Sequence, residues 1–322
     1  AILHKYGKFF SDGTLNGRKI DREAYFLVEG ENPVTMAKST GLALLEFTDA
    51  FEHLKPDIVI VLGDRFESMA ITIAARYTNI PVAHIEGGEV SGSIDNSIRN
   101  AISQMAQFHF PATQMAVDRL LQLGINKEYI FQVGASSIDM LSRNSLNDLN
   151  PLIEAQRTKG VGPVLDPHGE YLIVIQHPVT TEYGYNRHYI LQTIEAIDTL
   201  RIPTFWIWPN MDAGTDEISK AIREYREKER PDFIHFWTSL PIELYGPLLN
   251  NCSCIVGNSS SGIREAAFLG VPTVNIGSRQ KGRERTENVI DVDNDKEQIK
   301  SAILKQLKQE RYNKNYIYGD GL

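Results

Sequence analysis

The sequence contains little cysteine, no long apolar run and no excess of positive charge. Its two cysteines, Cys252 and Cys254, are too few and too close together for a disulfide framework. A C-x-C pair without further Cys or His nearby does not favour zinc, so we interpret both as thiols at a strand edge and expect a reducing, cytoplasmic location. No apolar run reaches the ~18 residues of a membrane span, and the first residues lack the pattern of a secretory signal.

Acidic residues outnumber basic ones: 41 Asp and Glu against 33 Lys and Arg give a net charge of −8, and the isoelectric point is near 5.6. Nucleic-acid binding needs a basic face, so this balance argues against it, whereas a few placed cations are enough to bind a nucleotide. The 322 residues, 42% of them hydrophobic, have ordinary globular composition and suffice for about two domains.

Apolar runs and helical stretches alternate after an irregular start over residues 1–33. The continuous run 58–62 is typical of a parallel strand buried on both faces. Further strands are expected at 81–85, 108–111 and 130–133, and helices at 34–55, up to about residue 77, at 96–107 and at 114–123. Such alternation predicts a doubly wound parallel sheet.

The polar segment 141–170 holds Gly and Pro, and we place a domain boundary there, giving domains 1–160 and 161–322, with the final segment packing back toward the first. A second series follows, with strands at 171–176, 204–208, 233–237, 254–257 and 273–277, and helices at 186–200, 215–228, 241–249 and 295–310. The predicted fold class is α/β, with two Rossmann-like domains facing a cleft. In such sheets ligands bind beyond the carboxyl ends of the strands.

The segment 254–279 is the most informative, because it reads as strand, hydroxyl-rich loop, helix and strand. Ser259, Ser260 and Ser261 stand where the helix is expected to begin, and a helix start offers free N–H groups and a positive dipole end to phosphate. Arg279 follows the next strand and adds charge. Serine capping is the alternative, but the whole unit favours phosphate or diphosphate binding.

Charged and catalytic residue types gather at the ends of the other predicted strands. They are Asp64 and Arg65 after 58–62, Glu86, Glu89 and Asp95 after 81–85, His177 after 171–176, and Asn210 and Asp212 after 204–208. Each has a structural alternative: Asp64 as a helix cap, Glu86 in a solvated turn, a structural His177, and Asn210 and Asp212 as turn or capping residues. Carboxylates from one domain and a phosphate loop from the other suit a nucleotide-sugar enzyme. No cluster with metal-ligand spacing is seen, so neither metal nor cofactor is expected.

Several long motifs resemble the hydrolysing UDP-N-acetylglucosamine 2-epimerases, from about residue 5 to the end of the chain. They are LGDRFE, HIEGGEVSGSIDNSIRNAIS, QHPVTTE, PNMDAG, GNSSSGIREAAFLGVPTVNIGSRQKGRERTENV and YGDG. The resemblance implies a GT-B-like fold, conversion of UDP-N-acetylglucosamine and water to N-acetylmannosamine and UDP for sialic-acid-type biosynthesis, and a homodimer or homotetramer.

The resemblance also implies roles for individual residues. Asp64, Glu86 and Asp95 resemble the acid/base carboxylates, with Arg65 beside them, and His177 resembles the catalytic histidine near the diphosphate, where we expect it to be protonated. The ligands of UDP are expected among Ser259, Ser260, Ser261, Glu265 (ribose), Arg279 and, more weakly matched, Asn210.

The expected chemistry is loss of UDP from C1 with removal of the C2 proton, giving a 2-acetamidoglucal, followed by addition of water at C1 and return of a proton at C2. Four alternatives stay open: a UDP-2,4-diacetamido-trideoxyhexose as substrate, a non-hydrolysing epimerase, a GT-B glycosyltransferase, and a binding module without activity. Relative to the family, the sequence is expected to lack an opening strand with its Arg-containing loop and a final helix.

Overall fold

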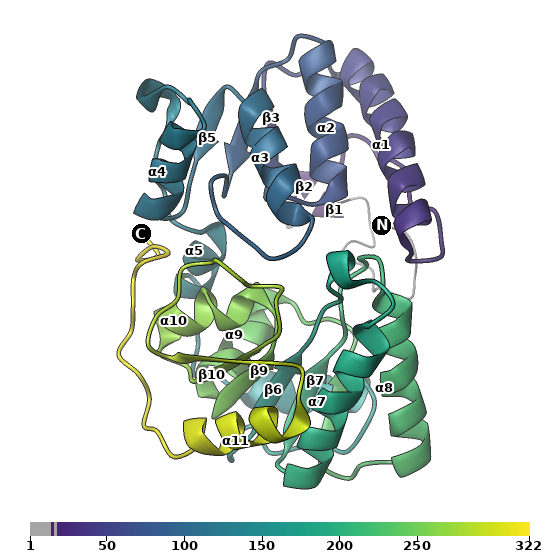
Figure 1. Cartoon of the computed structure of the whole chain (residues 1–322), viewed down its shortest axis with the longest axis vertical. Coiled ribbons are helices and arrows are strands. Elements are labelled where there is room, and N and C mark those ends of the chain that lie inside the picture. Colours follow the sequence, from purple (N-terminus) through teal and green to yellow (C-terminus); the bar gives the residue numbers. More distant parts are fainter. Residues whose placement is uncertain (1–13, 16–17) are drawn as a thin grey trace. The chain divides into compact units, whose positions relative to one another are not determined.

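The computed structural model describes residues 14–15 and 18–322, and the chain forms two compact units (Figure 1). Unit 1 extends to Glu89 and resumes over Ile94–Val133, and unit 2 comprises Val90–Ser93 and Gly134–Leu322. The packing therefore changes at Gly134, ahead of the polar segment 141–170, and α5 (Ser136–Ser142) and α6 (Asn150–Thr158) belong to unit 2. The division into domains 1–160 and 161–322 stays a prediction.

Unit 1 is built on a three-stranded parallel sheet in the order β3-β4-β5. Its strands are β3 (Val59–Leu62), β4 (Val82–Ile85) and β5 (Phe108–Phe110), and a short antiparallel pair, β1 (Thr14–Leu15) and β2 (Arg18–Lys19), precedes them. Its helices are α1 (Pro33–Leu54), α2 (Phe66–Tyr77), α3 (Asp95–Met105), α4 (Gln114–Gln122) and the 3₁₀ turn η2 (Lys127–Tyr129).

The core of unit 1 lies between β3, β4 and the helices α1, α2 and α3. Val59 and Val61 point into it and pack with Phe51, Ala74 and Ile102, among others. Ile60 and Leu62 face outward, 66% and 53% exposed, so the expectation that 58–62 is buried on both faces is wrong. The reason is that one face of β3 packs in the core, whereas residues on its other face are exposed, so buried and exposed residues alternate along the strand.

A second expectation for this unit is also wrong, because residues 130–133 do not form a strand. Ile130 makes an isolated parallel bridge to His109, and the chain then continues without regular structure to Ala135. A strand needs a ladder of bridges along its length, and here only one bridge forms, although the N–H groups of Phe131 and Val133 donate to the carbonyls of His109 and Pro111.

Unit 2 contains a six-stranded sheet in the order β11-β10-β9-β6-β7-β8, all parallel. The strands are β6 (Leu172–Ile175), β7 (Thr204–Ile207), β8 (Ile234–Trp237), β9 (Cys254–Gly257), β10 (Thr273–Ile276) and β11 (Val289–Val292), of which β11 was not predicted. The helical elements are α7 (Asn186–Leu200), α8 (Thr215–Glu229), α9 (Ile242–Asn251), α10 (Glu265–Leu269), α11 (Lys296–Gln306), and the 3₁₀ turns η3 (Thr180–Glu182) and η4 (Ser260–Gly262). If the six strands β6 to β11 are renumbered 1 to 6, the sheet order read from β8 is 3-2-1-4-5-6, which is that of a doubly wound dinucleotide-binding sheet. This order confirms the expected α/β class.

Both faces of the unit 2 sheet are covered. On one face Leu172, Val174 and Trp206 pack against α7, α8 and α11. On the other face the hydroxyl of Tyr171 donates to the carbonyl of Leu248 in α9 at 2.7 Å, and Phe205 stacks on Trp237. The central strands are consequently buried along their length, and functional side chains have access to ligand only beyond the strand ends.

Neither cysteine forms a disulfide, and both are buried in unit 2. Cys254 is the first residue of β9, and Cys252 lies between α9 and that strand. Burial raises the pKa of the Cys252 thiol to about 12 and also that of Cys254, so neither is a ready nucleophile. In the part of the chain that is described, no helix is both long and apolar enough to span a membrane.

Candidate active site

The strand order of unit 2 reverses between β6 and β9, which lie side by side at the centre of the sheet. Connections leave these two strands in opposite directions, so a crevice opens at their carboxyl ends, where ligands of this fold class bind. His177 follows β6 and Asn258 follows β9. The sequence placed His177 and the serine-rich segment at strand ends, and the topology now places both at the reversal itself.

His177 and Asn258 are joined by a pair of hydrogen bonds. The backbone N–H of His177 donates to Oδ1 of Asn258 at 2.7 Å, and Nδ2 of Asn258 donates to the carbonyl of His177 at 2.9 Å. Asn258 is only 2% exposed. The loop after β6 is therefore held against the loop after β9 by a buried amide that sequence reasoning did not single out.

The ring of His177 is fixed by a further contact. The backbone N–H of Asn210 donates to its Nδ1 at 3.1 Å, so Nδ1 is an acceptor and the ring proton is on Nε2. This arrangement differs from the protonated His177 that we expected, because a doubly protonated ring has no acceptor for that N–H. His177 is placed to donate through Nε2 as a neutral imidazole.

The three serines begin a tighter turn than expected. They form the 3₁₀ turn η4, N-capped by Ser259, whose Oγ accepts the N–H of Ser261 at 3.3 Å, and α10 begins only at Glu265 and is five residues long. The expected α-helix start at the serines is therefore wrong. The N–H groups of Gly262 and Ile263 are taken by carbonyls three residues earlier, which is 3₁₀ geometry.

Two of the three serine hydroxyls are hydrogen-bonded within the protein, that of Ser259 as the cap of the turn and that of Ser261 to a tyrosine. Ser261 Oγ is hydrogen-bonded to the hydroxyl of Tyr245 from α9, and burial raises the pKa of that phenol far above its usual value. Ser260 is half-buried, and its hydroxyl contacts no partner among the described residues. Ser260 is thus better placed than Ser261 to contact a ligand.

Arg279 lies beside this turn, as expected. Its Nη1 donates to the carbonyl of Asn258 at 3.2 Å, and Nε2 of the buried Gln280 donates to the same oxygen at 2.8 Å. The carbonyl of Arg279 accepts the N–H of Gly92 at 2.9 Å, from the short segment Val90–Ser93 that packs with unit 2. A guanidinium, an imidazole N–H and the serine turn therefore surround one end of the central strands, a combination that attracts a diphosphate.

The other two predicted UDP ligands differ in their surroundings. Glu265 is 7% exposed, and its Oε2 is buried without a hydrogen-bond partner among the described residues. Asn210 donates through Nδ2 to Asp212, and its carbonyl and that of Asp212 both accept the hydroxyl of Thr215. Asn210 and Asp212 thus build the turn after β7, as the structural alternative held, while the Asn210 backbone orients His177.

In unit 1, Asp64 forms an ion pair with Arg99 of α3. The Arg99 side chain is 2% exposed, that of Asp64 is 22% exposed, and Arg99 Nη1 also donates to the carbonyl of Glu89 at 2.8 Å. Asp64 does not cap α2, whose N-cap is Arg65 without a side-chain bond, so that alternative is excluded. The sequence offered one signal that Arg99 could pair with a carboxylate, namely its position four residues after Asp95 on the same face of a helix.

The segment after β4 has an unusual backbone. Glu86 has a φ of +63°, which L-residues rarely adopt, and is 8% exposed. Such strain persists where surrounding structure enforces it, and it is common at functional sites. Asp95 begins α3 and is half-buried, and Glu89 is 4% exposed, so the three carboxylates of this segment lie in unit 1 with Asp64. Arg65 donates through Nε to Glu67 at 2.6 Å.

His84, on β4, supports the loops that carry these carboxylates. Its Nε2 lies 2.8 Å from the carbonyl of Gly63, next to Asp64, and its Nδ1 lies 3.0 Å from the hydroxyl of Ser103. Burial lowers the pKa of His84 to about 4, so the ring is neutral at pH 7 and Nε2 donates to the carbonyl. A Cβ at Gly87 would stand 2.8 Å from the His84 ring, so the turn must be glycine there.

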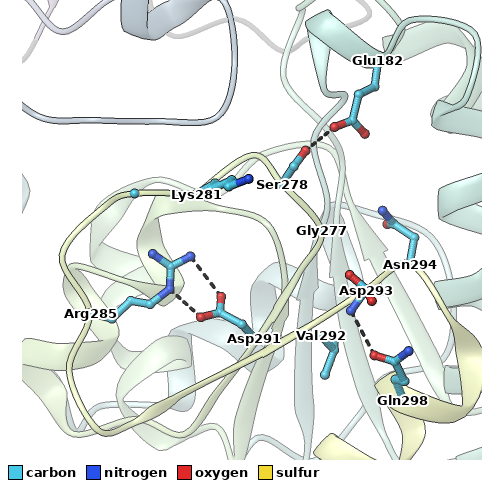
Figure 2. Close-up of a pocket in the computed structure, with 11 residues that line it drawn as sticks. Glu182, Gly277, Ser278, Lys281, Arg285, Asp291, Val292, Asp293, Asn294 and Gln298 are labelled. Carbon is cyan, nitrogen blue, oxygen red and sulfur yellow. Dashed lines mark hydrogen bonds and ion pairs between the residues drawn. The ribbon is translucent and has the colours of Figure 1, made fainter.

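An open cavity of about 740 Å³ is lined by residues of the 277–285 loop and of the segment 291–298, together with Glu182 (Figure 2). Figure 2 shows three contacts among its lining residues: Arg285 forms an ion pair with Asp291, the hydroxyl of Ser278 donates to Glu182, and the backbone N–H of Asp293 donates to Gln298. None of the predicted site residues lines it. The cavity is therefore not part of the predicted site.

The sequence profile of the UDP-N-acetylglucosamine 2-epimerase family matches residues 4–322. The chain belongs to this family. The resemblance seen in the motifs is thus confirmed, and the chain is an epimerase of the UDP-N-acetylglucosamine 2-epimerase type.

Relatives in this family have substantial identity to the chain. A Legionella pneumophila protein named UDP-N,N'-diacetylbacillosamine 2-epimerase (hydrolyzing) is 37% identical, over 89% of this chain and 74% of that protein. A Campylobacter jejuni GDP/UDP-N,N'-diacetylbacillosamine 2-epimerase (hydrolyzing) is 33% identical, over 89% and 75%. A Neisseria meningitidis UDP-N-acetylglucosamine 2-epimerase is 31% identical, over 94% and 76%.

Solved structures of family members share the fold. The Methanocaldococcus jannaschii UDP-GlcNAc 2-epimerase in complex with UDP-GlcNAc and UDP matches with a TM-score of 0.71 at 22% identity, over 89% of this chain and 78% of that one. The Neisseria meningitidis UDP-GlcNAc 2-epimerase bound to UDP-GlcNAc matches with a TM-score of 0.72 at 19% identity, over 92% and 81%. The fold is α/β, has two parts and is GT-B-like, as expected from the sequence.

Proposed function

We propose that this epimerase is hydrolysing, and that it converts a UDP-linked 2-acetamido hexose and water to the free 2-epimeric sugar and UDP. The observation that carries the proposal is the similarity to two relatives named as hydrolysing enzymes, at 37% and 33% identity over 89% of the chain. The anion-binding features around His177 and Arg279 give the departing UDP a place to bind.

In this proposal unit 2 stabilises the leaving group. The C1–O bond to the diphosphate breaks, and negative charge develops on the departing phosphate oxygens. Arg279, the Nε2–H of His177 and the hydroxyl of Ser260 are the groups that we assign to this charge, with Ser259 and Ser261 shaping the turn. The His177 ring and the Arg279 guanidinium are held by hydrogen bonds to the protein before the substrate arrives, so these two donors need little reorganisation during the reaction. Glu265 and Asn210 are assigned to the uridine side of the same ligand.

Unit 1 supplies the proton transfers. Removal of the C2 proton as UDP leaves gives a 2-acetamidoglucal, water then adds its oxygen at C1, and a proton returns to C2 from the other face. Two transfers on different faces require at least two acid/base groups, which we assign to Asp64, Glu86 and Asp95, with Arg65 as a neighbouring charge. Pairing with the buried Arg99 stabilises Asp64 as a carboxylate, which suits the base.

Two substrates are candidates. UDP-N-acetylglucosamine is the one expected from the motifs, and a 31% identical relative carries that name. UDP-N,N'-diacetylbacillosamine, the alternative weighed as a UDP-2,4-diacetamido-trideoxyhexose, is favoured by the two relatives named for it, one of them at the higher identity of 37%. A homo-oligomeric enzyme in a pathway to sialic-acid-type sugars is part of the same proposal.

The test is incubation with each UDP-sugar in D2O, without an acceptor, followed by mass spectrometry and proton NMR of the products. We expect UDP and the free 2-epimer with deuterium at C2, and faster turnover of the true substrate. An epimer still linked to UDP would instead identify a non-hydrolysing enzyme. A C2 position without deuterium, or no reaction with either sugar, would contradict the proposal.

A further inference from the structure

Asn258 is the point at which three loops of unit 2 meet. Its side chain bonds the backbone of His177 in both directions, and its carbonyl accepts from Arg279 and Gln280. Its own N–H donates to the carbonyl of Ile175 at 3.1 Å, at the end of β6. Every polar atom of this buried residue therefore holds a loop that ends at the reversal of the sheet.

The contacts of His177 show what this anchoring achieves. Two hydrogen bonds from Asn258 fix the backbone of His177, and one from the backbone of Asn210 fixes the Nδ1 edge of the ring. The direction of the remaining ring N–H then depends on both attachments. The serine turn begins with the residue after Asn258, so the same amide sets the distance between His177 and Ser259.

We propose that Asn258 is a positioning residue, which holds the Nε2–H of His177 in register with the serine turn and with Arg279. The inference rests on the proposed function, because the donors that Asn258 holds in place are the ones proposed to face the departing diphosphate. An amide is required chemically, since one side chain must accept from an N–H and donate to a carbonyl on the same residue. Aspartate has the size of asparagine and lacks the donor.

A buried asparagine that only satisfies backbone groups is the alternative, and the chain offers a matched control for it. Asn288 is also 2% exposed, and its Nδ2 donates to the carbonyl of Val271 at 2.8 Å. It precedes β11, at the opposite ends of the strands. Asn288→Asp therefore removes the same kind of bond with a similar cost in stability, but far from His177.

The experiment compares Asn258→Asp, Asn288→Asp and the unchanged full chain below their unfolding temperatures. It measures kcat with the better UDP-sugar, the Kd of UDP by calorimetry, and the ¹⁵N signals of the His177 ring, assigned through a His177→Gln variant. For Asn258→Asp we expect a 10- to 100-fold fall in kcat with a UDP Kd within about threefold, because misplacing a catalytic group costs rate before it costs binding. We also expect the pattern of a single Nε2–H tautomer to be replaced by averaged signals.

For Asn288→Asp we expect none of these changes. If Asn258→Asp and Asn288→Asp behave alike in kcat and in the His177 spectrum, the inference is overturned. If the unchanged chain turns over neither sugar, the proposed function fails separately, and the His177 spectrum still tests the inference. Loss of the tautomer pattern in Asn258→Asp but not in Asn288→Asp supports positioning by Asn258. Retention of the pattern in Asn258→Asp overturns the inference.

Discussion

The ion pair of Asp64 and Arg99 in unit 1 has one almost fully buried partner. Arg99 is nearly inaccessible to solvent, and its two identified partners are the Asp64 carboxylate and the carbonyl of Glu89. A buried charge is costly without its partner, whereas an apolar pair of similar volume is tolerated. The pair therefore ties folding to the placement of a proposed catalytic carboxylate.

Arg99→Met should destabilise the fold by about 3 kcal/mol, because it leaves Asp64 without its buried cation. The double variant Asp64→Asn with Arg99→Met should be less destabilised than the sum of the two single changes. Denaturant unfolding measures both. Arg201→Met is the control, since its pair with Asp232 is largely exposed, and it should cost under about 1 kcal/mol. Additive effects of the two changes at Asp64 and Arg99 would show that the pair is not coupled.

His84 makes stability depend on pH. Its pKa in the native state is about 4 against a usual 6.5, chiefly because burial lowers it; the hydrogen bond to the Gly63 carbonyl raises it in part, and His109 and Glu86 have smaller, opposite effects. In the unfolded chain the His84 ring takes up a proton near pH 6.5, whereas in the native state it stays neutral until the pH approaches 4. The stabilisation is thus complete above pH 6.5 and lost as the pH falls toward 4, by roughly 3 kcal/mol.

His84→Gln should flatten the fall in unfolding free energy between pH 6.5 and 4, as measured by urea unfolding at several pH values. His53→Gln, at an exposed histidine of α1, should retain the slope of the unchanged chain. An unaltered slope in His84→Gln would show that other groups carry this pH dependence.

Among the elements, the short segment Val90–Ser93 is unusual because it packs with unit 2 while its neighbours on both sides pack with unit 1. Gly92 donates to the carbonyl of Arg279, and a Cβ at Gly92 would overlap the carbonyl oxygen of Ser278. Glycine is needed there for close backbone approach rather than for a left-handed conformation. The segment joins the carboxylate-bearing stretch of the chain to the loop that carries Arg279.

Gly92→Ala should displace this segment from the 277–285 loop and increase amide hydrogen exchange at residues 278–282, with a fall in turnover of about tenfold or more. Gly41→Ala is the matched control. A Cβ at Gly41, inside α1, meets nothing within 4 Å, so that change should stabilise the chain by about 0.5–1 kcal/mol and leave exchange at 278–282 unchanged. Unchanged exchange in Gly92→Ala would mean that the contact does not order the loop.

At the scale of the whole molecule, UDP should bind to unit 2 and raise the unfolding temperature, since a ligand that binds only the folded state stabilises it. At about 100 times its Kd this amounts to roughly 2.7 kcal/mol. Arg279→Ala should reduce the shift, because a guanidinium beside the serine turn is lost. Thermal unfolding with increasing UDP concentrations measures the change.

Arg285→Ala provides the comparison for this measurement. Arg285 belongs to the same loop but lines the separate cavity and is paired with Asp291 (Figure 2). We expect the shift by UDP to survive this change. A shift lost in Arg285→Ala and retained in Arg279→Ala would move the UDP site to the cavity.

The sequence could predict most elements because their signals are local. The apolar strands of unit 2, the alternating helices and the charged residues that follow each strand are readable from neighbours along the chain. The failures were of another kind. Residues 130–133 have strand-like composition but find only one bridge, and the outward residues of β3 are exposed although the run is uniformly apolar. Both outcomes depend on which segments lie alongside.

By itself, the sequence determined the fold class, the family and the gathering of Asp64, Glu86, His177 and the serines at strand ends, because hydrophobic period and short motifs are properties of adjacent residues. Only the tertiary structure decided that Arg99 holds Asp64, that Asn258 holds His177, and that Tyr245 takes the hydroxyl of Ser261. These partners are 35, 81 and 16 residues apart. Hydrogen bonds over such separations form between loops and helices that the tertiary fold brings together, and no local pattern encodes which segments meet.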